Sequence, residues 1–242
     1  MRKDSWILPV LIAAVGIALA GWFIGHGFVQ GRMADRFVTV KGLAERDVMA
    51  DLALWPIRFA ATDNNLAAAQ RKIEESQQAV FTFLQGHGIG REQVELQQLQ
   101  VNDLLTNPYR SGPMDSRYII NASLMVRSEK PQEIQAVSQR ISELVQAGVV
   151  LSSNEGPFSG PNYLFTGLNH LKPDMIAEAT ANARRAAEQF AKDSGSHLGK
   201  IRNANQGTFV ILPRDGASGV SEENQLQKTV RVVSTIEYYL SD

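Results

Sequence analysis

The longest stretch without a formal charge, from Ser5 to Gly31, constrains this chain more than any other feature of its sequence. Charged residues occupy positions 2–4 before it, and Arg32 follows it. Its apolar centre, residues 6–24, is close to the ~20 residues that an α-helix needs to cross the hydrocarbon of a bilayer. The sequence therefore predicts one N-terminal membrane helix. This fixes where the rest of the chain lies, but not what it does.

Four residues of this segment are candidate membrane-anchor residues. Trp6 and Trp22 lie ~24 Å apart along a helix, and tryptophan favours the membrane–water interface. Gly21 and Gly25 form a GxxxG pair, which would let two such helices approach closely. Glycine is also frequent in membrane helices without that role, and we favour this simpler interpretation of the pair.

A cleaved signal peptide is the competing interpretation of the same segment. A basic start, an apolar run and the small-x-small sequence Ala18-Leu19-Ala20 fit such a signal. Cleavage after Ala20 would leave an apolar new N-terminus, and the run is longer than a signal core of roughly 7–15 residues. We therefore favour a retained anchor, while cleavage remains the alternative.

Charge does not decide the orientation of the helix. Two basic residues precede the segment and three follow it closely: Arg2, Lys3, Arg32, Arg36 and Lys41. Long domains translocate largely regardless of charge. We therefore expect a short cytoplasmic tail and anchor in residues 1–31 and an exported domain in residues 32–242. The absence of cysteine is compatible with an oxidising periplasm.

The composition of the chain is that of an ordinary globular domain, with 44% hydrophobic and 20% charged residues. Basic and acidic residues number 24 and 25, so the net charge is −1. Without a basic surplus or an acidic run, we expect neither a nucleic-acid partner nor a disordered acidic tail.

Three helices are predicted by capping residues and apolar spacing. The first follows Asp63-Asn64-Asn65 and stops before Gly86-His87-Gly88, and the second runs from Pro131 to Gly148. The third begins at Pro173 and ends at Gly195, with seven alanines between positions 177 and 191. Side chains this small would let the third helix lie close to a sheet.

Alternating apolar and polar residues predict strands around these helices. The pattern reads β–α–β–β twice, with strands near 51–61, 93–105 and 117–127, and again near 162–167, 200–212 and 228–240. We therefore predict an α+β fold of antiparallel sheets with packed helices. Its two quasi-repeats, at about 46–127 and 160–240, are joined by the additional helix that begins at Pro131.

Two long polar loops, Asn107–Ser116 and Pro213–Asn224, occupy the same place in the two predicted repeats. They are long for hairpin connections. Loops of this kind often carry binding or assembly contacts, and disorder at the surface is an equally good interpretation.

The sequence contains no recognisable catalytic or metal-binding constellation, so we assign no catalytic residue, metal or cofactor. It has no cysteine nucleophile and no GxSxG motif. The histidines lack HxxxH or HExxH spacing; they are His26, His87, His170 and His197. A hydrolase would need two or more of the last three to converge with carboxylates such as Asp174 or Asp193.

Several segments together resemble the SIMPL-domain family over about residues 37–240. These are Val38–Glu45, Asp51–Ala53, the alanine-rich third helix with Leu198–Ile201 after it, and the closing strand Val230–Tyr238. The chain departs from the commoner pattern at Lys41-Gly42-Leu43 and lacks the proline often found before Asp51.

The resemblance implies a bacterial envelope protein, secreted or held by one N-terminal helix in the inner membrane. It implies no shared catalytic residues, a role in envelope or oxidative stress, and ring-like or channel-like homo-oligomers. Our leading hypothesis is thus a non-enzymatic, membrane-anchored periplasmic domain that self-assembles. The alternative is a binding module for a small envelope ligand or a partner protein, which would need an apolar pocket between sheet and helix. An unrecognised hydrolase is the third hypothesis.

Overall fold

The computed structural model describes residues 7–33, 36–106, 115–152 and 160–241. The chain forms two compact units, which we describe separately. Unit 1 comprises residues 1–45, 173–210 and 231–242, and unit 2 comprises residues 46–172 and 211–230.

The chain begins with the helix α1 (Ile7–Met33), which is 27 residues long. Its window Val10–Gly27 has a mean hydropathy of 1.9, and none of it is buried within the protein. Among the described residues, this is the one helix long and apolar enough to cross a membrane, as the sequence predicted. Trp6 lies outside the described residues, so the predicted tryptophan pair stays a prediction.

A four-stranded sheet has the order β1–β9–β7, and a fourth strand, β8, also pairs with β9. Its strands are β1 (Phe37–Met49), β7 (His197–Gln206), β8 (Val210–Pro213) and β9 (Gln227–Ser241). β1 and β9 run antiparallel, since the Leu240 N–H donates to the Arg36 carbonyl while Thr229 at the other end donates to Asp47. β9 alternates buried and less buried residues, as expected for an antiparallel sheet with one solvated face.

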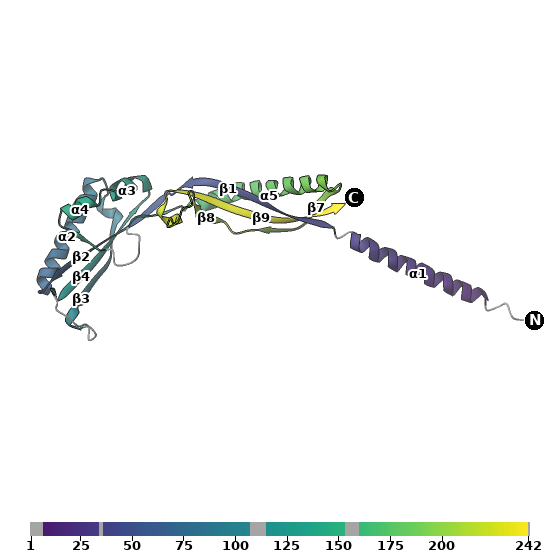
Figure 1. Ribbon diagram of the computed structural model, residues 1–242, viewed down its shortest axis with the longest axis horizontal. Helices are drawn as coiled ribbons and strands as arrows, with labels where there is room; N and C mark the ends of the chain where they lie inside the picture. Colours follow the sequence, from purple (N-terminus) through teal and green to yellow (C-terminus); the bar gives the residue numbers. More distant parts are fainter. Residues whose placement is uncertain (1–6, 34–35, 107–114, 153–159, 242) are drawn as a thin grey trace, which may run out of the picture. The chain divides into compact units, whose positions relative to one another are not determined.

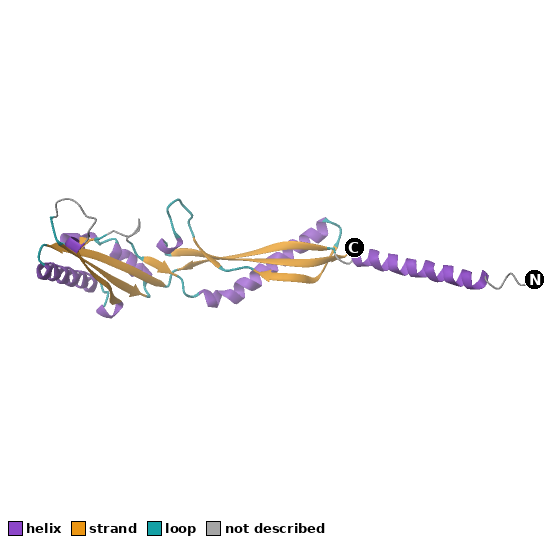
Figure 2. Cartoon of the chain, turned by 90° about the horizontal axis from the view of Figure 1, so that it is seen from below, coloured by secondary structure: helices purple, strands orange, loops and turns teal. Residues whose placement is uncertain are grey.

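The helix α5 (Leu168–Asp193) lies along one face of this sheet (Figure 2). Its buried residues recur every four positions and are small after the first: Met175, Ala179, Ala183, Ala187 and Ala191. A Cβ on Gly42 of β1 would overlap the Ala179 carbonyl oxygen and lie 2.8 Å from the Ala183 Cβ. Helix backbone therefore touches strand backbone here, which confirms the close approach predicted from the alanines.

The five-stranded sheet of unit 2 has the order β3–β4–β2–β5, with β6 also paired to β2. Its strands are β2 (Leu52–Asp63), β3 (Val94–Asp103), β4 (Tyr118–Ser128), β5 (Val150–Leu151) and β6 (Asn162–Leu164). The strands β2, β4 and β3 are labelled in Figure 1. Three helices belong to the same unit: α2 (Leu66–Gly86), α3 (Pro131–Ser138) and α4 (Ser142–Gln146). Short 3₁₀ helices follow or precede strands at Arg91–Gln93, Leu104–Thr106 and Glu222–Asn224.

The core of unit 2 lies between one face of its sheet and these helices. Trp55, Phe59 and Leu124 from the sheet pack in one cluster with Val80 and Leu84 from α2. All five are essentially inaccessible to solvent. Burial of such large side chains is the main stabilising contribution to a domain of this size.

Two predicted helices differ from the observed ones. The second is interrupted after Ser138, where the N–H groups of Arg140 and Ile141 bond three residues back rather than four; these tighter bonds end α3 before α4 begins. The third begins at Leu168 rather than Pro173, which lies inside α5. Its earlier start is fixed by Asp51, whose carboxylate accepts the N–H groups of Thr166 and Gly167.

The second predicted β–α–β–β group differs from the structure in two strands. The first strand of this group is the short β6, which pairs with β2 in the five-stranded sheet. In the four-stranded sheet, the neighbour of β9 at the edge opposite β7 is β1. The predicted strand at 200–212 is two strands, β7 and β8, separated at Gly207. A Cβ at Gly207 would overlap the Val233 carbonyl, and its N–H donates to that oxygen. The origin of the two groups by duplication stays a prediction.

Candidate functional site

The strand β3 is a free edge of the five-stranded sheet. It pairs antiparallel with β4, and among the described residues no strand covers its other side. An uncovered edge presents unpaired backbone N–H and C=O groups, which are a template for pairing with another chain. Natural edge strands are usually protected by lysine, proline or a bulge. β3 has neither lysine nor proline.

Three apolar side chains of β3 lie on the helix side of the sheet but remain half exposed. Leu96, Leu99 and Val101 are 50%, 56% and 49% exposed. Each pairs with a core residue of β4: Leu124, Ala122 and Ile120. A bulge between Leu96 and Gln98 keeps the three on one face. We call these three side chains the β3 stripe.

The β3 stripe is exposed because α2 packs on β2 and β4, the inner strands of the sheet. Leu105, just after the strand, adds a fourth exposed aliphatic side chain. Contiguous exposed apolar side chains on a free edge mark an interaction site more strongly than scattered ones do. The β3 stripe is therefore our candidate interaction surface.

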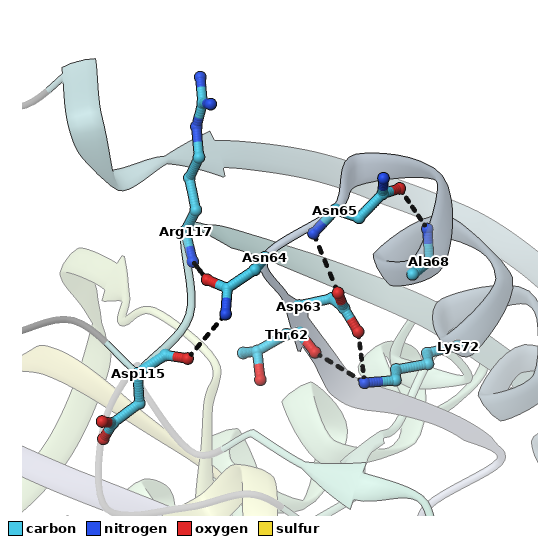
Figure 3. Close-up of polar contacts among 8 residues, drawn as sticks. All are labelled: Thr62, Asp63, Asn64, Asn65, Ala68, Lys72, Asp115 and Arg117. Atoms are coloured by element: carbon cyan, nitrogen blue, oxygen red, sulfur yellow. Dashed lines mark hydrogen bonds and ion pairs between the residues drawn. The ribbon is translucent and has the colours of Figure 1, made fainter.

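A polar junction holds the end of β2 and the start of α2 (Figure 3). The Asn65 side chain caps α2 by accepting the Ala68 N–H at 3.2 Å. Asp63 accepts the Asn65 N–H at 2.9 Å and pairs with the Lys72 ammonium at 2.7 Å. This hydrogen bond with Lys72 lowers the pKa of the Asp63 carboxyl.

The same junction ties together the ends of β3 and β4. Arg117 donates to both carboxylate oxygens of Asp103, at 2.8 Å for the shortest bond, and this lowers the pKa of Asp103. The Asn64 side chain accepts the Arg117 N–H and donates to the Asp115 carbonyl (Figure 3). Most of the predicted loop Asn107–Ser116, namely residues 107–114, lies outside the described residues.

The other predicted loop, Pro213–Asn224, is described in full and is bound to its surroundings. Gln225 donates to the Asp215 carbonyl at 3.0 Å. The fully buried Lys228 donates to the carboxylate and the carbonyl of Glu222. Pairing a buried ammonium in this way avoids an uncompensated buried charge, so the contacts fix the loop rather than offer a site.

Polar side chains line a hollow of about 240 Å³ on the other face of the β3–β4–β2 sheet. The side chains that point to this face are Arg58, Gln98, Gln100, Asn121 and Ser123, joined by Ser152 after β5. Amide and hydroxyl groups can both donate and accept hydrogen bonds. The hollow therefore suits a small polar ligand, unlike the apolar sheet–helix pocket that the binding hypothesis required.

The histidines do not meet in one place among the described residues. His87 pairs with Glu143 at 3.0 Å and contacts Arg140, and His26 stacks on Trp22. In the described part of the chain, no three His, Asp or Glu residues are grouped to hold a metal. The convergence with Asp174 or Asp193 that would have indicated a hydrolase is not seen there.

The remaining anchor candidates lie on the open surface of α1. Trp22 is largely exposed, and a Cβ on Gly21 or Gly25 would meet no atom within 4 Å. An exposed apolar helix surface suits lipid or a second helix equally. The assignment of Trp22, Gly21 and Gly25 as anchor residues therefore stays a prediction.

The sequence predicts a strand near 93–105, but not which of its side chains are exposed. The signal was present in the order Val-Glu-Leu-Gln-Gln-Leu-Gln-Val at 94–101. Alternation predicts which residues share a face. It does not predict that α2 leaves the face of β3 uncovered.

The chain is an α+β protein of antiparallel sheets with packed helices. An N-terminal helix that is able to span a membrane precedes them. The chain belongs to the SIMPL family: the family described as "SIMPL: Protein of unknown function (DUF541)" matches residues 38–238. The match extends over both units and begins after α1. No curated protein sequence matches the chain.

Proposed function

We propose that this protein is a non-enzymatic domain, held in the bacterial inner membrane by α1 and facing the periplasm, whose copies assemble through β3. The observation that carries this proposal is the β3 stripe on an unpaired sheet edge. Pairing of the edge would satisfy its backbone groups and remove the apolar side chains from water at the same time.

The self-assembly is tested by a polar substitution within the β3 stripe. Leu99→Gln keeps the side-chain size while making burial against another chain unfavourable, so we expect a loss of oligomers. Val145→Thr is the matched control, because Val145 is 59% exposed but lies on α4. Sedimentation velocity of the detergent-extracted variants measures the size of their oligomers. Equal oligomer size in the Leu99→Gln variant and the wild type would exclude β3 as the assembly edge.

The anchor function of α1 rests on its length, its apolar composition and the exposure of its window Val10–Gly27, none of which is buried. We expect the full chain to stay with membranes after alkaline carbonate washing and to begin with its own N-terminus. Release into the wash, or a mature N-terminus at Gly21, would indicate a signal peptide instead.

The periplasmic orientation is proposed on the family resemblance, and it is compatible with the charge pattern because long domains translocate largely regardless of charge. Because the chain has no cysteine, a single Ser221→Cys substitution gives one labelling site on an exposed residue of unit 2. We expect a membrane-impermeant maleimide to label it in intact spheroplasts. Labelling only after lysis would show that this domain faces the cytoplasm instead.

A role in envelope or oxidative stress follows from the same resemblance. We expect deletion of the gene to lower survival under detergent or peroxide stress, with rescue by the wild type but not by the Leu99→Gln variant. Rescue by both would separate the stress role from assembly.

A binding module remains the second candidate, favoured by the polar hollow on the outer face of the five-stranded sheet. Its ligand would be small, because drug-sized ligands occupy pockets of about 300–1,000 Å³. Amide chemical-shift changes at Gln98 and Asn121 on addition of envelope sugars would support it. Unchanged shifts at millimolar sugar would exclude that ligand class.

A further inference from the structure

We propose that the strand that pairs with the free edge of β3 is β7 of a second copy of this chain, an inference that rests on the self-assembly proposed above. The partner is thus another molecule of the same protein, and the contact joins two different strands. Length and charge favour β7 over the other edge strands.

β7 is a free edge of the other sheet, and its length equals that of β3. β7 pairs antiparallel with β9, and no strand among the described ones covers its outer side. Both β3 and β7 contain 10 residues. Two edges of equal length can satisfy each other's backbone groups without leaving a long unpaired overhang.

The charges of the two strands are complementary. β3 carries two acidic residues, Glu95 and Asp103, and no basic one. β7 carries two basic residues, Lys200 and Arg202, and no acidic one. Opposite charges on facing strands stabilise pairing, whereas like charges oppose it. Pairing of β3 with a second β3 would bring acidic strands together.

One charge on each strand is available for this contact. Asp103 is occupied by Arg117, and Arg202 lies 3.8 Å from Glu237 and over the Phe37 ring. Glu95 and Lys200 are exposed, and within the described ranges neither has an ion-pair partner. A Glu95–Lys200 attraction between copies would give each of them a partner.

The other long edge strand, β1, fits less well, and the edge strands β5, β6 and β8 are only two to four residues long. β1 is 13 residues long and carries two basic and two acidic residues: Lys41, Arg46, Glu45 and Asp47. Two of these already have partners on β9, since Glu45 binds Arg231 and Asp47 accepts the Thr229 hydroxyl. β1 therefore offers no net charge to the acidic β3.

Each of the two strands also has an exposed aliphatic side chain near its middle. Leu99 of β3 is 56% exposed and Ile201 of β7 is 51% exposed. Both strands contain register irregularities, near Gln97 and near Ile201. Bulges discourage indiscriminate edge pairing. The opposite charges of β3 and β7 would therefore select these two strands as partners.

A β3–β7 contact uses a different surface on each copy. Two copies joined by one such head-to-tail contact leave one β3 and one β7 unpaired, so we expect further copies to add until a ring closes or a filament grows. The proposed contact therefore predicts assemblies larger than a dimer.

The test is a charge swap in the full-length, detergent-extracted protein. Glu95→Lys and Lys200→Glu should each weaken assembly by tenfold or more at low salt, because each places like charges across the contact. The chain that carries both changes should assemble again, because every contact then has one charge of each sign. Glu129→Lys, an exposed reversal of the same sign between β4 and α3, should assemble as the wild type does.

Two outcomes would overturn the inference alone: single reversals that assemble like the wild type, or a double variant no better than either single one. A wild type that stays monomeric would overturn the proposed self-assembly as well, so the two failures are distinguishable. All the substituted residues are exposed, and a thermal melt of each variant checks the fold.

Crosslinking gives an independent readout, since the chain has no cysteine of its own. Chains with Gln98→Cys on β3 and chains with Asn203→Cys on β7 should give dimers with a short bis-maleimide only when mixed. Dimers from the Gln98→Cys chain alone would show β3 pairing with itself and overturn the inference.

Discussion

Two residues fix how α5 meets the rest of the protein. Gly42 lets the helix backbone lie against β1, and Asp51 holds the two N–H groups that precede the helix. Both belong to the segments that resemble the SIMPL family. Their role here is to position backbone, which explains why a glycine and a short carboxylate are needed there.

Gly42→Ala tests the close approach. The added methyl group overlaps α5 backbone, which cannot rotate away, so we expect a loss of about 1–3 kcal/mol in the free energy of unfolding. Gly86→Ala is the control, because a Cβ there meets no atom within 4 Å. Urea unfolding measures both. Equal stability of the two variants would show that α5 does not lie against Gly42.

Asp51→Asn tests the carboxylate at the start of α5. The amide keeps one acceptor oxygen but loses the charge and turns an NH₂ group toward Thr166 or Gly167. Because hydrogen bonds to charged groups contribute about 1.5–3 kcal/mol, we expect a loss of that order. Asp215→Asn removes an exposed ion pair with Arg214 and should change the unfolding free energy little. Hydrogen exchange at Thr166 should rise only in the Asp51 variant.

Among the elements, those with strong local signals were predictable from the sequence. The Asn65 cap and the apolar spacing located α2, and alternation located β2 and β4. The start of α5 was not predictable, because a proline inside a helix resembles a proline at its first position. The contact that decides between them comes from Asp51, more than 100 residues earlier.

The candidate interaction surface was predictable only in part. The apolar residues of β3 could be counted from the sequence, but their exposure depends on where α2 packs across the sheet. The pairing of β6 with β2 rather than within the four-stranded sheet is likewise a long-range event. Local pattern carries no information about which sheet a three-residue strand joins.

The β3–β4 end of the sheet should be sensitive to acid. Arg117 lowers the folded-state pKa of Asp103 below its unfolded value, so the pair stabilises the fold above the unfolded pKa of about 3.9. This contribution is lost as the pH falls through the lower folded pKa. We therefore expect Asp103→Asn to reduce the difference in unfolding free energy between pH 6 and pH 2.5. An unchanged difference would mean that the pair does not contribute.

The whole chain combines a membrane-compatible helix with two free sheet edges, β3 and β7, that carry opposite charges. Family membership and the apolar leader were readable from sequence, whereas the edges were not. An anchor concentrates copies in one plane, which favours contacts between them. The anchor and the assembly are thus expected to act together, and removal of α1 should weaken association.

The most direct test is native mass spectrometry of the full-length protein extracted from membranes. We predict a species larger than a dimer whose mass is an integral multiple of the intact 26.6 kDa chain. That result would show a retained helix and self-assembly in one measurement. A single species at 26.6 kDa at micromolar concentration would contradict the assembly, and subunits shortened by the residues up to Ala20 would contradict the anchor.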